Sequence, residues 1–242
     1  ALNAIAEPPL IVTGERLPQS VTPHETPKFG VLPSGVEIQP FLKESPHLQV
    51  QDPTSSVSLS LLRSIEQTPH RILDLCAGRG TKTRQLRSMF PNAMIGATEP
   101  NDIRRASLQE IAKELDFTVY APKEEGPTEP FDLVVADVPC SNSGVFARRP
   151  EAKYRYDEKH ITSLVELQQT IIRDGVAVLN PNGHFLYATC SIDREENGSQ
   201  IAWMQSKRKL SLVDQSATLP SGTPTSDPAT WHDGGFAALL QR

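Results

Sequence analysis

The sequence predicts an α/β protein in which a mostly parallel, doubly wound sheet carries helices on both faces. Two observations lead to this prediction. From residue 54 onward, short apolar runs alternate with helical patterns of about 10–15 residues, which is typical of parallel strands joined by helical crossovers. Each of the three cysteines closes an apolar run, and such sheets bind their ligands at the carboxyl ends of strands. We therefore expect Cys76, Cys140 and Cys190 at the ligand-binding edge.

The first elements of this region follow from apolar spacing. Apolar residues recur at helical spacing over 55–65, and RILDLC (71–76) is a short apolar run that predicts a strand. TKTRQLRSMF (81–90) predicts a helix and AMIGAT (93–98) a strand. DIRRASLQEIAKEL (102–115) is a second helix, because its apolar residues recur with a period of about 3.6.

The remaining elements continue the alternation. In chain order we expect a weak strand, a strong strand, a long helix, a strand, a helix and two closing strands, at 117–120, 131–137, 160–179, 184–189, 194–206, 210–213 and 235–240. The expected sheet is thus seven-stranded.

The N-terminal segment 1–50 differs from the rest in its proline content. Nine of the 21 prolines fall at or before Pro53, and proline removes a backbone donor and disfavours helix. We expect this segment to be extended, irregular or lightly stranded, and to be a remnant of, or a linker to, an upstream region. Residues 51–242 then form the α/β domain.

Composition limits the function classes. The 242 residues are 38% hydrophobic and 22% charged, and no apolar run approaches the roughly 20 residues that span a bilayer. Three cysteines without CxxC spacing indicate a reducing compartment, so we expect a cytoplasmic protein. The net charge of −5 opposes nucleic-acid binding in bulk but leaves room for a local basic face.

The first motif, LDLCAGRGTKT (73–83), joins a strand to a helix through a glycine-containing turn. It is neither a P-loop nor a complete GxGxxG pattern. The backbone of such a turn can approach a ligand closely, and Glu99, at the end of the next strand, can accept hydrogen bonds from a ribose. Nucleoside binding and an ordinary strand–turn–helix connection both remain open on this motif alone.

The second motif, DVPCSNSGVFARRPEAKYR (137–155), places Asp137 at a strand end and Cys140 after a turn that Pro139 stiffens. Cationic and aromatic side chains follow, a mixture that suits contacts with RNA backbone and bases. A solvated loop with ordinary charges is the alternative.

The third motif, YATCSIDREEN (187–197), puts Cys190 before a predicted helix. Asp193 and Glu196 fit a capping box at that helix start, which makes Glu195 and Glu196 structural. A helix start near Cys190 favours its thiolate, whereas an inert buried cysteine is the alternative. The cysteines are too widely spaced for a zinc site, so no metal is expected.

Together the motifs resemble the RNA cytosine-C5 methyltransferases of the NOL1/NOP2/Sun (Fmu) group, in particular its bacterial small-subunit ribosomal RNA enzymes. The family pattern reads QDxSS, LDxCAAPGGKT, DAPCSGTGVxRRxPD, YxTCSxxxEEN and DGFFxAxL. This chain has QDPTSS, LDLCAGRGTKT, DVPCSNSGVFARRPE, YATCSIDREEN and DGGFAALL in the same order. Glu99 stands in place of the usual aspartate, and VYAPKEEGPTEP (119–130) offers no clear equivalent of the family's acid after the third strand.

The resemblance implies a Rossmann-like class I methyltransferase that uses S-adenosylmethionine. It implies a thiolate nucleophile, Cys190, that adds to cytosine C6, and a second cysteine, Cys140, that helps to release the product. Asp137 would hold the N3/N4 edge of the base. The implied cofactor-binding residues are Asp74, Cys76, Ala77, Gly78, Gly80, Lys82, Glu99, Arg104 and Asp137. The implied substrate-binding residues are Lys82, Pro139, Arg148 and Lys153.

The implied partner is RNA, in particular ribosomal RNA, with the protein acting as a monomer and without a metal or a membrane. Two alternatives stay open. One is a degenerate, non-catalytic member of the fold that binds RNA or ribosomes. The other is a different methyltransferase chemistry such as amino methylation, from whose usual (Asn/Asp)-Pro-Pro-aromatic turn the tetrapeptide DVPC departs.

Overall fold

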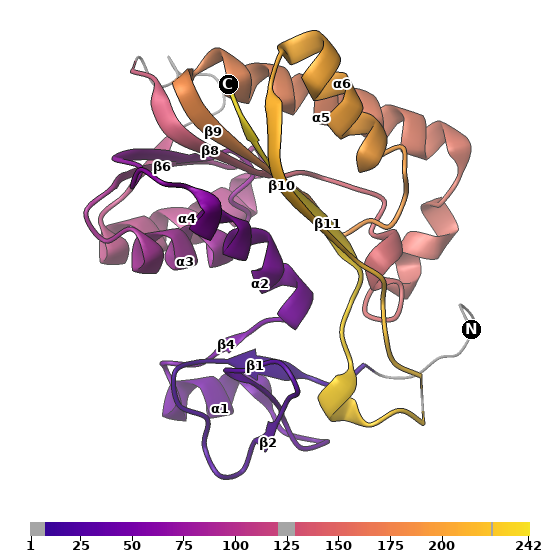
Figure 1. The fold of residues 1–242 in the computed structure, drawn as a ribbon. Helices are drawn as coiled ribbons and strands as arrows, with labels where there is room; N and C mark the ends of the chain where they lie inside the picture. The colour runs from indigo at the N-terminus through magenta and orange to yellow at the C-terminus, as the bar shows by residue number, and fades with distance from the viewer. Residues whose placement is uncertain (1–7, 121–128, 224) are drawn as a thin grey trace.

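The computed structural model describes residues 8–120, 129–223 and 225–242, and these form a large sheet with a smaller one below it (Figure 1). The strands of the large sheet are β5 (Arg71–Asp74), β6 (Met94–Thr98), β7 (Thr118–Tyr120), β8 (Phe131–Asp137), β9 (Leu179–Thr189), β10 (Ser211–Thr218) and β11 (Gly235–Gln241). The helices around it are α2 (Pro53–Ser60), α3 (Thr81–Met89), α4 (Asp102–Leu115), α5 (Glu158–Ala177) and α6 (Gly198–Arg208).

The large sheet has the strand order β10-β11-β9-β8-β5-β6-β7. Strands β5 to β9 pair in parallel, and β11 pairs antiparallel with both β9 and β10. The predicted seven-stranded, doubly wound sheet is confirmed. Chain order reverses between β5 and β8, so the crevice where such sheets bind ligands lies at the carboxyl ends of these two strands.

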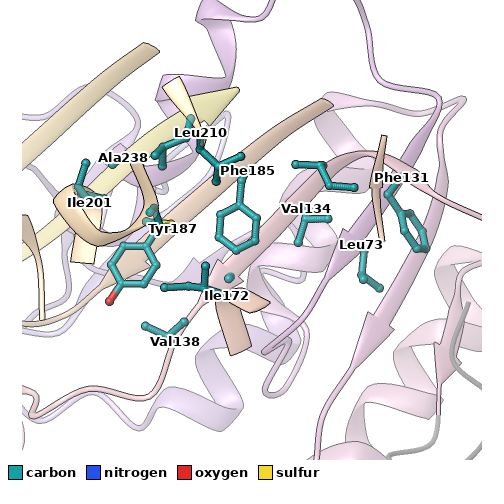
Figure 2. Close-up of a cluster of buried hydrophobic side chains, with 14 residues drawn as sticks. Leu73, Phe131, Val134, Val138, Ile172, Phe185, Tyr187, Ile201, Leu210 and Ala238 are labelled. Atoms are coloured by element: carbon teal, nitrogen blue, oxygen red, sulfur yellow. The ribbon is translucent and has the colours of Figure 1, made fainter. Parts of the chain in front are cut away.

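Alternate residues of the central strands face opposite sides of the sheet. Leu73, Val134 and Phe185 pack with Ile172 of α5 on one side (Figure 2). The neighbouring residues of the same strands, such as Ile72 and Val135, pack with α2 and α3 on the other. Both sides are covered, which explains why these strands read as continuous apolar runs rather than as alternating ones.

The N-terminal segment forms its own small sheet, of order β2-β3-β1-β4, with one short helix. Its elements are β1 (Ile11–Thr13), β2 (Thr22–Pro23), β3 (Phe29–Val31), α1 (Ile38–Glu44) and β4 (Gln49–Val50). The short strands agree with the sequence expectation, but α1 was not expected because it contains Pro40. That proline lies in the first helical turn, where its missing N–H has no intrahelical partner to lose.

The C-terminal part of the chain returns to this small sheet. Trp231 is buried against Ile11, Phe29 and Val31, and its carbonyl oxygen lies 2.8 Å from Nε2 of His24. The loop before β11 therefore joins the small sheet to the large one, as the yellow segment of Figure 1 shows.

Several boundaries differ from the prediction, and β10 extends five residues beyond the predicted end at 213. The helix expected at 55–65 ends at Ser60 and continues as a 3₁₀ turn over Leu61–Ser64. The helix expected at 194–206 begins at Gly198, so the proposed capping box of Asp193 and Glu196 is wrong. Strand β9 begins five residues before the apolar run HFLYAT, at Leu179, because its first residues also pair with β8. Most of the segment 119–130, residues 121–128, lies outside the described residues.

Among the described residues, no helix is both long enough and apolar enough to cross a bilayer.

Replacing Leu108 by alanine should destabilise the domain. Leu108 of α4 is fully buried against Ala77 and Ala97, so Leu108→Ala is expected to lower the free energy of unfolding by about 2–5 kcal/mol. Ile103 on the same helix is 74% exposed, and Ile103→Ala should change it by less than about 0.5 kcal/mol. Urea unfolding followed by circular dichroism measures both, and equal losses would contradict this packing of α4.

Candidate active site

A cavity of about 890 Å³ opens at the carboxyl ends of β5, β6, β8 and β9. Most of the residues predicted for the site line it, namely Cys76, Ala77, Gly78, Lys82, Glu99, Arg104, Asp137, Pro139, Cys140, Arg148 and Cys190. The other three predicted residues, Asp74, Gly80 and Lys153, are not in its lining. The topological switch point thus coincides with the cavity, as the fold class predicts.

The two thiols of Cys140 and Cys190 meet in this cavity. Strands β8 and β9 are parallel neighbours in which Asp137 pairs with Ala188, and the cysteines follow three and two residues later. Their Sγ atoms lie 3.1 Å apart. The hydrogen bond with Cys190 raises the pKa of the Cys140 thiol well above its usual value, and burial adds to this effect. Apolar patterning predicts both cysteines at this edge of the sheet, and the resemblance implies that the two thiols face one pocket.

Hydroxyl groups from both cysteine loops converge on Asp193. Its Oδ2 accepts hydrogen bonds from Ser141 at 3.0 Å, Ser143 at 2.6 Å and Ser191 at 3.0 Å, while Oδ1 accepts one from Tyr156. Burial alone would raise the pKa of Asp193, but these hydrogen bonds outweigh it and lower the pKa. Asp193 therefore ties the two loops together instead of capping a helix.

Glu196 also links the Cys140 loop to the chain that follows Cys190. Its side chain is fully buried, and Oε1 accepts hydrogen bonds of 2.9 Å from the Ser141 N–H and from the Gln168 amide. The expectation that Glu196 is structural agrees with these contacts, although its partners are a loop and α5 rather than the start of α6.

The side chains of Lys82 and Asp137, which both line the cavity, form an ion pair. Lys82 Nζ lies 2.7 Å from Asp137 Oδ2 and 3.4 Å from the Ser55 hydroxyl. Burial alone would lower the pKa of Lys82, but the Asp137 carboxylate outweighs it and the pKa is raised. The pair presents a carboxylate and a cation beside the two thiols.

The turn after β5 leaves room for a ligand backbone or ring. Gly78 has φ +58° and no atom within 4 Å of where a Cβ would stand, and Gly80 has φ +84° at the start of α3. Both positions favour glycine. Glu99 is 2% exposed, and its Oε1 accepts hydrogen bonds from the Asn101 N–H and the Arg104 guanidinium. Asp74 is buried, with Oδ2 bonded to Thr83 and Oδ1 without a partner among the described residues.

The guanidinium of Arg148 forms ion pairs and a hydrogen bond with other residues of the protein. Its guanidinium lies 2.6 Å from Asp233, 3.1 Å from Asp52 and 2.9 Å from the Pro9 carbonyl oxygen. Burial raises the pKa of Asp233 to about 6, against the opposing effect of Arg148. Substrate binding by Arg148 stays a prediction, but the observed contacts are structural and link the N-terminal segment to the cavity wall.

Lys153 lies away from the cavity, with its ammonium 6.0 Å from the centre of the Phe146 ring. The sequence reasoning missed Asp52, Asn142 and Asp233, which line the cavity. Asp52 lies in the motif QDPTSS and Asp233 in the motif DGGFAALL. Their places in these motifs were the signal by which the sequence could have identified them. Among the described residues, no group of three or more His, Cys, Asp or Glu side chains is placed to hold a metal ion.

Arg148→Met should destabilise the protein strongly. The carboxylates of Asp52 and Asp233 are each only 8% exposed, and removing the cation from a buried ion pair costs about 3–5 kcal/mol. The neighbouring Arg149 is exposed, and Arg149→Met should change the free energy of unfolding by less than about 0.5 kcal/mol. Urea unfolding compares the variants. Similar values for both would mean that the Arg148 ion pairs contribute little.

Asp74 should make stability depend on pH. Burial, reinforced by the Asp137 carboxylate, raises its pKa from 3.8 to about 6. The folded protein therefore binds this proton more tightly than the unfolded chain, and the resulting stability is present below pH 3.8 and lost as pH rises through about 6.

Asp74→Asn keeps an oxygen for Thr83 but does not titrate. Between pH 4 and 7, the free energy of unfolding of Asp74→Asn should fall less than that of the native protein. The two falls should differ by about 3 kcal/mol at most. Urea unfolding at four pH values measures the difference, and parallel pH profiles would contradict the raised pKa.

Comparisons with known proteins identify the family of this chain. The family model of the 16S rRNA methyltransferase RsmB/F matches residues 61–234. Ribosomal RNA small subunit methyltransferase B of Klebsiella pneumoniae (strain 342) is 30% identical over 202 residues, which cover 80% of this chain and 46% of the relative. This chain thus spans about half the length of the curated relatives it matches.

Two solved structures are similar to the whole fold. NSun6 from Pyrococcus horikoshii with SFG has a TM-score of 0.67 and 25% identity, over 89% of this chain and 57% of that one. A methyltransferase homolog protein from Pyrococcus horikoshii has a TM-score of 0.69 and 18% identity, over 97% of this chain and 86% of that one. The second likeness concerns the fold alone. Because the family model matches most of the chain, the chain belongs to the RsmB/F family of 16S ribosomal RNA methyltransferases.

Proposed function

We propose that this protein transfers a methyl group from S-adenosylmethionine to C5 of a cytosine in ribosomal RNA. The observation that carries the proposal is the pair of thiols 3.1 Å apart, beside the carboxylate of Asp137, in one cavity. Membership of the RsmB/F family supports it, as does the name of the Klebsiella relative, which is a ribosomal RNA methyltransferase.

Cys190 is proposed as the nucleophile because it is the more exposed of the two thiols. C5 of cytosine is too weak a nucleophile to take a methyl group unaided. Addition of the Cys190 thiolate to C6 forms an S–C6 bond and makes C5 enamine-like, which divides one difficult step into two easier ones. To enter the cavity, the target cytosine has to unstack from the neighbouring bases of the RNA, as is usual for enzymes that modify bases.

Cys140 is proposed as the residue that releases the product. After methyl transfer, C5 carries both the new methyl group and its original hydrogen. The Cys140 thiolate takes that proton and becomes a thiol, the C–H electron pair restores the C5–C6 double bond, and the S–C6 bond breaks to return Cys190 as a thiolate. The short distance between the two sulfur atoms allows both to reach adjacent carbons of one ring.

Asp137 and Lys82 are proposed to orient the base. A carboxylate can accept a hydrogen bond from the cytosine N4 amino group and can share a proton with N3. The Lys82 ammonium, 2.7 Å away, keeps Asp137 in place through their ion pair. The pair can therefore hold the edge of the ring opposite C5 and C6.

The residues of the β5 and β6 ends fit the proposed cofactor. Gly78 leaves open space beside the cavity, and Glu99 places a carboxylate where ribose hydroxyls could donate to it. The exposed cationic side of Arg104 and the turn at Cys76 and Ala77 complete this cradle. S-adenosylmethionine would supply a methyl group on a sulfonium. The NSun6 relative, solved with the analogue SFG, supports the same choice.

Residues 51–242 are proposed to form the methyltransferase domain, with 1–50 as a separate N-terminal segment. The protein is proposed to act as a monomer in the cytoplasm, where it would meet ribosomal RNA. A non-catalytic member of the family that only binds RNA or ribosomes is the second candidate. The differences from the family pattern in the AGRGTKT turn favour that alternative, whereas the paired thiols favour catalysis.

A trapping experiment tests the proposal. Cys140→Ala protein, incubated with S-adenosylmethionine and ribosomal RNA, should accumulate a covalent adduct that migrates slowly on a denaturing gel, because attack proceeds while release fails. The Cys140→Ala/Cys190→Ala double variant should form none. An absence of adduct together with no S-adenosylmethionine binding in calorimetry would favour the non-catalytic alternative.

A further inference from the structure

Asn142 contacts both cysteines of the site. Its Nδ2 donates to the Cys140 carbonyl oxygen at 2.9 Å, and its Oδ1 accepts from the Cys190 thiol at 3.3 Å. The residue also lines the cavity. No other side-chain amide in the described part of the chain forms a hydrogen bond with Cys190, so Asn142 is well placed to influence this thiol.

The backbone at this position is one in which glycine is the natural residue. Asn142 has φ +61°, in the left-handed region that glycine adopts freely and asparagine tolerates best among other residues. The family pattern has glycine here, in CSGTG, where this chain reads CSNSG. The amide is therefore an addition to the site rather than a requirement of the turn.

The hydrogen bonds fix which end of the amide faces Cys190. If the amide were flipped, its oxygen would face the Cys140 carbonyl oxygen, and two acceptors would meet without a proton between them. With Nδ2 on that carbonyl, Oδ1 has to face the Cys190 sulfur. A carbonyl oxygen can accept from a protonated thiol, but it repels a thiolate.

The thiol protons then have a definite order. The Cys190 S–H points to Asn142, so the 3.1 Å contact between the two sulfurs is made by the Cys140 S–H donating to the Cys190 sulfur. This chain of hydrogen bonds requires one proton on each sulfur. The nucleophile is thus held in its less reactive, protonated form as long as no substrate cytosine occupies the cavity.

We propose that Asn142 is a positioning residue that holds Cys190 as a protonated thiol until the substrate base enters and displaces the contact. The inference rests on the proposed function, in which Cys190 is the nucleophile, and deepens it. It predicts that this chain has a less reactive resting nucleophile than it would have with the glycine of the family pattern.

The test measures thiol reactivity without RNA or cofactor. The whole chain is alkylated with iodoacetamide between pH 6 and pH 10, and mass spectrometry of peptides separates Cys190 from Cys140 and Cys76. In Asn142→Gly, which fits the left-handed backbone, Cys190 should react about fivefold faster at neutral pH, the factor that one ordinary hydrogen bond represents. The midpoint of its pH–rate profile should move to lower pH.

Two further variants sharpen the test. Asn142→Asp has the same shape but places a negative charge against the sulfur, so Cys190 should react more slowly than in the native protein. Asn182→Gly replaces another left-handed asparagine, φ +64°, which is exposed on the far part of β9, and it should change nothing. The reactivity of the half-buried Cys76 monitors the fold, since loss of structure would raise it.

Unchanged or slower alkylation of Cys190 in Asn142→Gly, with Cys76 unaffected, would overturn the inference. This outcome is distinct from failure of the proposed function. If the trapping experiment gives the adduct but alkylation is unchanged, Cys190 is the nucleophile and Asn142 does not restrain it. If alkylation accelerates but no adduct forms, the restraint on the thiol is real and the methyl-transfer proposal fails.

Discussion

The parallel pairing of β8 with β9 is the constraint on which the site depends. The register that places Asp137 opposite Ala188 brings the two cysteine loops out of the sheet side by side. Both strands are buried on both faces, and a shift of one residue would turn Val134, Phe185 and their neighbours from one helix layer to the other. The apolar core thus fixes the distance between two sulfur atoms that no direct bond joins.

The loops beyond the strands need a second kind of restraint, because a strand end alone leaves a loop free to move. Here the restraint is polar and largely buried. Asp193 accepts hydrogen bonds from hydroxyl groups of both cysteine loops, and Glu196 accepts one from the Ser141 N–H. The Gly144 N–H donates to the Cys190 carbonyl oxygen at 3.0 Å. These hydrogen bonds hold the two cysteine loops against each other, whereas the strands alone fix only where each loop begins.

Much of this arrangement could be predicted from the sequence, and the failures have a common physical cause. Apolar runs gave the strands, and the cysteines at their ends gave the edge of the sheet. Asp193 and Glu196 were mistaken for a helix cap because their spacing of three is local, whereas their real partners, such as Ser141 and Gln168, are distant in the chain. The ion pairs of Arg148 with Asp52 and Asp233 could not be predicted either, because these carboxylates lie 96 and 85 residues away in the chain. Local patterns predict elements; they do not reveal partners brought together by the fold.

The two cysteines have the same chemistry, so their different proposed roles have to come from their surroundings. Cys140 is buried, and both its contact with Cys190 and burial raise its pKa, so its thiolate, once formed, is a strong base that suits removal of the C5 proton. Cys190 is more exposed, lies at the cavity wall and has the Asn142 amide oxygen against its sulfur. In the proposed mechanism, an entering cytosine would displace the Asn142 amide from the Cys190 sulfur and so remove the contact that favours the thiol. The asymmetry between nucleophile and releasing group is therefore built into the walls of the cavity, before any substrate is bound.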